Sequence, residues 1–137
     1  MTGSVSSAAT VKAKSMPVPG RTLRPDSYQL HVLSELGGPV KSSSGLIVST
    51  ERMGSARFDT LIAVGGLGAF RASSSPALQA FVRRAAKSSR RISSVCSGTV
   101  ILAAAGLLDG LRATTHWQSA TFLQRKYPKI RVESDRI

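Results

Sequence analysis

The sequence lacks several features that define whole classes of protein. Cys96 is the only cysteine among 137 residues, so an internal disulfide scaffold is excluded. No apolar run approaches the roughly 20 residues that a membrane-spanning helix needs. The longest candidate, residues 100–108, is about half that length and is interrupted by Gly106. We therefore expect a cytoplasmic protein with no membrane contact.

Acidic and aromatic residues are also scarce. The chain has 7 Asp and Glu against 19 Lys and Arg, a net charge of +12, and only 5% aromatic residues. Five basic residues lie close together, which would suit a nucleic-acid binder: Arg83, Arg84, Lys87, Arg90 and Arg91. However, no zinc-finger or ribonucleoprotein spacing is present, and aromatic stacking platforms are few. A solvated helix end is the simpler interpretation, and direct nucleic-acid binding is the weaker alternative.

The remaining composition is that of one folded domain. Hydrophobic residues make up 42% of the chain, enough for a core, and its length allows a single domain. Residues 1–24 stand apart because they are basic and rich in Ser, and because Pro17, Pro19 and Gly20 break any periodic pattern. We expect residues 1–24 to be a disordered or extraneous leader and residues 25–137 to form the domain.

Short apolar strands alternate with amphipathic helices along the domain. Residues 60–64 are apolar on both faces, as is typical of a buried parallel strand. Ser75 and Pro76 form a helix start, because Ser caps a helix and Pro suits its first turn. The pattern predicts strands at residues 28–33, 60–64, 91–95, 113–115 and 130–133, with helices at 76–87, 99–107 and 117–126. This alternation indicates an α/β fold with a mostly parallel sheet.

Cys96 lies where a predicted strand becomes a helix. With the small Ser97 and Gly98 after it, the segment fits a nucleophile elbow, a sharp turn that exposes the nucleophile. A helix N-terminus favours a thiolate over a thiol. The Ser97 N–H and one from the turn at Gly65 and Gly66 are candidate donors to an oxyanion. The alternative is a small, buried core cysteine.

His116 follows the next predicted strand, so it lies at the same sheet edge as Cys96. It is a candidate base or orienting group, and the alternative is a structural histidine near Trp117. Trp117 either packs on the preceding helix or lines the pocket. One Cys and two His at this spacing cannot build a metal site. The Gly-rich turn at residues 65–68 lacks a nucleotide-binding pattern, so we expect no metal and no cofactor.

Three stretches of sequence resemble the ThiJ/PfpI superfamily. They are Val-Cys-Ser-Gly at 95–98, Leu-Ala-Ala-Ala-Gly-Leu-Leu-Asp-Gly at 102–110 and Arg-Ala-Thr-Thr-His-Trp at 112–117. Residues 38–40, 43–46, 58–62, 65–66, 127–128, 132–133 and 135–137 agree in order and spacing. The resemblance covers about residues 24–137. Within the superfamily it is strongest to the glutamine-amidotransferase-like N-terminal domain of AraC-type (GlxA-like) transcriptional regulators.

The resemblance implies a flavodoxin-like three-layer sandwich, with helices on both faces of a parallel sheet. It places the elbow nucleophile on Cys96, the family histidine on His116 and oxyanion-type donors around Gly66 and Ser97. In hydrolytic or lyase-like members an acid from the first strand or its following helix contacts the cysteine, and no acid here matches that position. We expect the domain to lack the family's first strand and last helix, and not to be an enzyme.

Two functions follow from the resemblance. The first is a truncated ligand-sensing or oligomerisation domain of an AraC-type regulator, which would reach DNA only through a helix-turn-helix module absent from this chain. Its pocket would be formed by Gly65, Gly66, Ser97, Gly98 and Trp117 beside Cys96 and would hold a small molecule. The alternative is a small cysteine-dependent enzyme, isonitrile hydratase-like or hydrolase-like. Missing layers would expose apolar faces and sheet edges, so we also expect a homo-oligomer.

Overall fold

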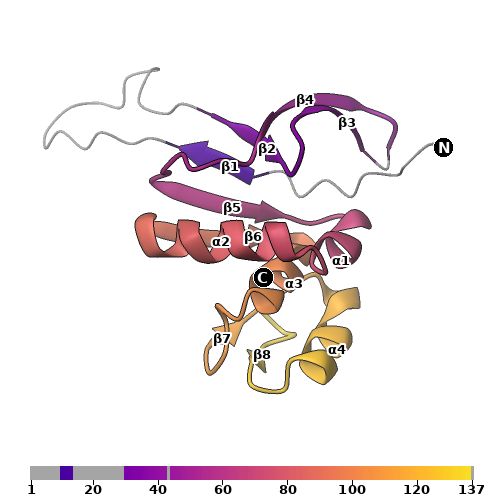
Figure 1. Cartoon of the computed structure of the whole chain (residues 1–137). Coiled ribbons are helices and arrows are strands. Elements are labelled where there is room, and N and C mark those ends of the chain that lie inside the picture. The colour runs from indigo at the N-terminus through magenta and orange to yellow at the C-terminus, as the bar shows by residue number, and fades with distance from the viewer. Residues whose placement is uncertain (1–9, 14–29, 43, 137) are drawn as a thin grey trace, which may run out of the picture.

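The computed structural model describes residues 10–13, 30–42 and 44–136, and its main feature is a six-stranded sheet (Figure 1). The strands lie in the order β3-β4-β2-β1-β5-β6. Their bounds are Thr10–Ala13 (β1), Val32–Ser34 (β2), Gly38–Lys41 (β3), Ile47–Arg52 (β4), Thr60–Val64 (β5) and Arg91–Val95 (β6). β7 (Arg112–Ala113) and β8 (Arg131–Val132) form a separate parallel pair.

Four α-helices accompany these strands in the described residues, so the predicted α/β class is confirmed. They are α1 (Gly68–Ala72), α2 (Pro76–Ser88), α3 (Thr99–Ala104) and α4 (Trp117–Lys126). α2 begins as the sequence predicts, because the Ser75 hydroxyl accepts a hydrogen bond from the Leu78 N–H at 3.2 Å. β5, β6 and α4 have the predicted bounds.

The sheet is mixed rather than mostly parallel in its pairing. β2 pairs with β4, and β5 with β6, in parallel. β1 is antiparallel to both of its neighbours, and β3 is antiparallel to β4. Four strands therefore share one direction, but only two of the five pairings in this sheet are parallel. The central strand β1 accounts for two of the three antiparallel pairings, since it runs against the strands on either side of it.

That central strand comes from the segment predicted to be a leader. Of residues 1–24, the structure describes only Thr10–Ala13, and these form β1. β1 pairs with β5 at four positions and with β2 at two. Here the structure differs from the prediction of a disordered leader. Sheet pairing uses backbone groups, so a four-residue strand leaves little periodic signal in its sequence. The other residues of 1–24 lie outside the described residues.

The main core lies on one face of this sheet. Leu61 and Ala63 of β5 point into it and are at most 3% exposed. They pack with buried residues of α1, α2 and α3. On the opposite face Ile62 is half-buried, while its neighbours Ser93 and Val95 on β6 are exposed. Within the described part of the chain, the helices of this core cover one face only. The second helical layer of the expected sandwich is not among the described residues.

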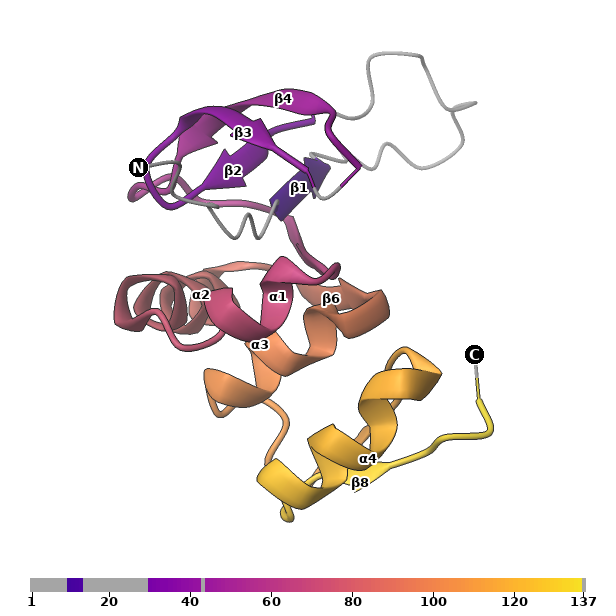
Figure 2. The same ribbon diagram turned by 90° about the vertical axis from the view of Figure 1, so that its right-hand side faces the viewer.

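A second core joins the C-terminal segment to the first (Figure 2). Val100 and Ala103 of α3 pack against Leu123 of α4 and Ile130, and all four are buried. α3 therefore lies between two cores, with Ile101 and Leu102 turned toward the sheet. None of the helices in the described residues is long and apolar enough to span a bilayer.

An ion pair fixes the start of β5 and yields a testable pH dependence. Arg90 donates to both carboxylate oxygens of Asp59, at 2.8 and 3.0 Å, and the Thr60 hydroxyl donates at 2.9 Å. The Arg90 bond, followed by the Thr60 bond, lowers the pKa of Asp59 from 3.8 to about 2. A carboxylate whose pKa is lowered by folding stabilises the fold above its unfolded pKa, and this stabilisation disappears as pH falls through the folded pKa.

We therefore expect Asp59→Asn to be less stable than the original chain at pH 6, with the difference shrinking between about pH 4 and pH 2. Urea unfolding followed by circular dichroism at several pH values measures this. The matched control is Asp109→Asn, because Asp109 meets Lys129 only at 3.9 Å between exposed side chains. Such a pair contributes little. If the difference in the free energy of unfolding between Asp59→Asn and the original chain persisted unchanged at pH 2, it would contradict the lowered pKa of Asp59.

Candidate functional site: a cysteine elbow at the sheet edge

Cys96 occupies a strained turn between β6 and α3. It directly follows Val95, the last residue of β6, and opens a single 3₁₀ turn, Cys96–Gly98. Its φ is +57°, and it is the one non-glycine residue with a positive φ in the described part of the chain. That conformation is costly for a residue with a Cβ, and such strain concentrates at functional sites. The side chain is exposed rather than buried in the core.

Two glycines allow the backbone to make this turn. At Gly98 an added Cβ would collide with the carbonyl group of Ala63 in β5. At Gly65, just after β5, a Cβ would lie 2.5 Å from the Ser97 nitrogen. Backbone therefore packs directly on backbone where β5 and β6 end. This close approach of backbone to backbone is the physical reason for the small residues around Cys96 in the sequence.

Ser97 joins the elbow to the glycine turn. Its buried hydroxyl accepts a hydrogen bond from the Gly66 N–H at 3.0 Å and donates to the Gly66 carbonyl at 3.1 Å. The structure thus brings Gly65, Gly66 and Ser97 together, as the sequence predicts. The Gly66 N–H is already bonded to Ser97 Oγ, however, so it does not point free toward an oxyanion in this arrangement.

His116 lies beside the elbow, at the start of α4. Its backbone N–H approaches the Cys96 carbonyl oxygen at 3.4 Å, and the Thr115 hydroxyl donates to the same oxygen at 3.2 Å. The His116 ring caps α4, because its Nδ1 accepts a hydrogen bond from the Gln118 N–H at 3.3 Å. A neutral imidazole with Nδ1 as acceptor has its proton on Nε2. The ring therefore offers a donor, not a base, on its other side.

Trp117 and two other apolar side chains near the elbow in sequence are open to solvent. The Trp117 side chain is 71% exposed, and its ring centroid lies 5.6 Å from that of His116. An exposure this high leaves little of the ring packed on the preceding helix, which was one of the two predictions for it. Leu67, beside the glycine turn, and Val95, beside Cys96, are 82% and 54% exposed. Large exposed apolar side chains of this kind are typical of a surface that meets a ligand or a partner.

Five of the six described acidic side chains, all except Asp135, make polar contacts elsewhere. Their polar partners are Ser75 for Glu35, His31 for Glu51, Arg90 for Asp59, Lys129 for Asp109 and Arg112 for Glu133. Within residues 10–13, 30–42 and 44–136, no hydrogen bond reaches the Cys96 sulfur. In the same residues, no cluster of three or more His, Cys, Asp or Glu side chains could hold a metal ion.

Sequence reasoning missed two threonines that hold the site together. Thr115 binds the Cys96 carbonyl, as described above. The Thr99 hydroxyl donates to the Thr114 carbonyl at 2.9 Å and lies 2.9 Å from the Ser94 hydroxyl. These contacts tie the strand before the elbow and the segment before His116 to the first turn of α3. The threonines stood next to the predicted site residues, but sequence proximity alone does not show such bonds.

A strand, a strained cysteine and a helix at one sheet edge define an α/β domain of the nucleophile-elbow class. The chain matches the DJ-1/PfpI family over residues 5–135 and belongs to that family. This confirms the resemblance on which the sequence analysis relied. The match includes Thr10–Ala13, the segment that forms β1.

Several relatives resemble parts of this chain. A Streptomyces lividans protein described as an uncharacterized protein in the cpoL 5′ region is 43% identical over 103 residues, 74% of this chain and 73% of the relative. The HTH-type transcriptional regulator CdhR of Pseudomonas aeruginosa is 38% identical over 112 residues, 80% of this chain but 33% of the regulator. Isonitrile hydratase of Pseudomonas putida is 37% identical over 91 residues, 65% of this chain and 40% of the hydratase.

A solved structure shows the same fold. The crystal structure of a ThiJ/PfpI family protein from Pseudomonas syringae superimposes with a TM-score of 0.67 at 32% identity. The likeness covers 77% of this chain and 45% of that structure. The chain therefore spans less than half of the length of that structure, of CdhR and of the hydratase.

Proposed function

We propose that this chain is the ligand-sensing or oligomerisation domain of an AraC-type transcriptional regulator. A small molecule would bind beside Cys96, and DNA binding would belong to a separate module of such a regulator. The observation that carries the proposal is chemical: in the described residues the Cys96 thiol is exposed but has no acidic partner. The similarity to CdhR over 80% of this chain supports it.

The candidate ligand pocket consists of Cys96, His116 and Trp117, with Gly65, Gly66, Ser97 and Gly98 shaping the backbone around them. His116 is better suited to binding than to proton abstraction, because the Gln118 N–H occupies its Nδ1. Its Nε2–H would donate to a ligand acceptor, and the exposed Trp117 ring would pack on an apolar part. We further propose that the exposed Leu67, Val95 and Trp117 are covered in a homo-oligomer.

A cysteine-dependent enzyme is the alternative, and the backbone strain at Cys96 favours it. A positive φ at an exposed nucleophile is a feature that enzymes of this class use. The similarity to isonitrile hydratase names one reaction to test, the addition of water to an isonitrile to give an N-substituted formamide. Such turnover needs a proton carrier near the thiol, which the described residues do not supply beyond His116.

Two assays on the intact chain separate these functions, with Cys96→Ser as the matched control. In the first, iodoacetamide is added to the folded protein. Because Cys96 is exposed and is the only cysteine, we expect stoichiometric labelling, and none in the control. Trp117 is the only tryptophan and lies near the site, so we expect its fluorescence to change on labelling.

In the second assay the chain is incubated with cyclohexyl isonitrile, and the formamide product is measured by chromatography. The sensor proposal predicts the same low rate for the original chain and for Cys96→Ser. Formamide production that depends on Cys96 would establish the enzyme instead. Failure of the folded protein to label with iodoacetamide would contradict an accessible pocket and remove the proposed ligand site.

A further inference from the structure

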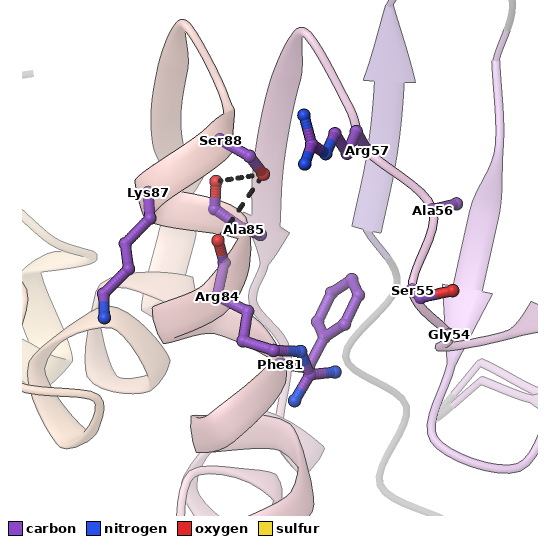
Figure 3. A pocket seen from close by; sticks show the side chains of 9 residues that line it. All are labelled: Gly54, Ser55, Ala56, Arg57, Phe81, Arg84, Ala85, Lys87 and Ser88. Atoms are coloured by element: carbon purple, nitrogen blue, oxygen red, sulfur yellow. Dashed lines mark hydrogen bonds between the residues drawn. The ribbon is translucent and has the colours of Figure 1, made fainter.

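A cavity that does not include Cys96 lies between the segment before β5 and α2 (Figure 3). It has a volume of about 610 Å³ and is formed by residues 54–57, between β4 and β5, and by the C-terminal half of α2. The 54–57 segment precedes β5, whereas the Gly65 turn of the elbow follows it. Five strand residues, roughly 15 Å, therefore separate the two sites along the sheet. The cavity is not part of the site proposed above.

The lining of this cavity is strongly basic. Arg57, Arg84 and Lys87 contribute to it, and none of its nine lining residues is acidic. Among the described residues, these three side chains form no ion pair. The acid nearest in sequence to Arg57 is Asp59, and both of its oxygens bind Arg90. The three positive charges of the cavity are therefore not neutralised by neighbouring side chains.

The two arginines reach the cavity from opposite walls. In Figure 3 Arg57 extends from the 54–57 segment toward α2, and the Arg84 side chain lies next to the Phe81 ring. Phe81 is 3% exposed, and its ring packs edge-on against Phe58 with centroids 6.3 Å apart. The guanidinium carbon of Arg84 lies 6.0 Å from the Phe81 centroid. A buried ring thus supports one arginine by a cation–π contact and limits its freedom.

We propose that this cavity binds a small phosphorylated molecule through Arg57 and Arg84. Guanidinium groups match phosphate oxygens in pairs of parallel hydrogen bonds, and a partly held side chain loses less entropy on binding. Lys87 also lines the cavity, but in Figure 3 its side chain points away from the two arginines. The volume is in the range of small-molecule sites and exceeds what a phosphate alone would fill, which leaves room for the rest of the ligand.

Isothermal titration of the intact chain with inorganic pyrophosphate tests the proposal. We expect saturable binding at one site per chain, weakened about tenfold or more by Arg57→Gln and by Arg84→Gln. Arg84→Lys keeps the charge but loses the paired geometry, so we expect an intermediate loss. The matched control is Arg125→Gln, which removes one charge from an exposed position on α4 and should change the affinity less than twofold.

Circular dichroism of each variant checks that the fold is intact. Absence of saturable pyrophosphate binding would overturn the proposal, as would an equal loss in Arg125→Gln, since binding would then reflect the net charge alone. Backbone phosphates of nucleic acid share this chemistry, so a 12-base-pair duplex is titrated in parallel. The proposal would also be overturned if the duplex bound more tightly than pyrophosphate, with a steep salt dependence, and if the cavity variants and Arg125→Gln weakened that binding equally. Such a result would indicate a general basic surface.

Discussion

Gly98→Ala is expected to lower the free energy of unfolding by about 3 kcal/mol, or to prevent folding altogether. The new Cβ would collide with the carbonyl carbon and oxygen of Ala63 and would lie 3.0 Å from the Val64 carbonyl carbon. All of these are backbone atoms of β5, which is paired on both sides within the sheet. These atoms cannot move away without distorting the strand pairing or the elbow, so relieving the clash lowers the stability of the fold.

Gly54→Ala is the matched control for this prediction. A Cβ at Gly54 would meet only the Arg52 carbonyl oxygen, at an ordinary 3.9 Å. Urea unfolding followed by circular dichroism gives the midpoint of each variant, and Cys96 labelling reports whether the elbow survives. Equal midpoints for the two alanine variants would contradict the close approach between the elbow and β5.

Leu61→Ala is expected to cost about 3 to 4 kcal/mol of folding stability. The Leu61 side chain is fully buried in the core between the sheet and helices α1, α2 and α3. Shortening it removes apolar contacts and leaves a cavity, since packed neighbours relax only in part.

The adjacent residue provides the control, because successive strand residues point to opposite faces. Ile62 faces the side of the sheet where Ser93 and Val95 are exposed, and it is only half-buried. We expect Ile62→Ala to cost about 1 to 2 kcal/mol, in line with partial burial. Chemical denaturation measures both. A loss at Ile62 as large as that at Leu61 would show that the second face is covered as fully as the first.

The elements predictable from sequence were those with strong local signals. The apolar run at Thr60–Val64, the strand Arg91–Val95 and the Pro-terminated helix Trp117–Lys126 have the expected bounds. β1 was not predicted, because its place depends on partners in β2 and β5, which lie far from it along the chain. α1 was not predicted either, since five residues starting at Gly68 show too little helical periodicity. An apolar residue type does not by itself place a side chain in the core, since Ile47 of β4 is 70% exposed.

The candidate site was predictable to a similar extent. The order of strand, Cys96, Ser97 and Gly98 in the sequence was enough to predict the elbow. The strand before His116 was expected at the same sheet edge, but β7 pairs with β8 in a separate sheet, and His116 meets the elbow through the Cys96 carbonyl. The hydrogen bond between Gly66 and Ser97, and the capping role of the His116 ring, depend on side-chain orientation, which sequence does not specify. The basic cavity joins Arg57 to Arg84 only through the packing of α2 against the sheet. Sequence reasoning had noted Arg84 as part of a charge cluster without finding its counterpart.

The antiparallel strand β1 joins two halves of this sheet. In the strand order β3-β4-β2-β1-β5-β6, Thr10–Ala13 is the one described segment hydrogen-bonded to both halves. One half carries the exposed β3–β4 hairpin, and the other carries Cys96 at the end of β6. If β1 detaches, each half keeps its own parallel pair. Opening at this seam is therefore a sub-global event that exposes the backbone amides of β2 and β5 facing β1 while the parallel pair within each half stays hydrogen-bonded.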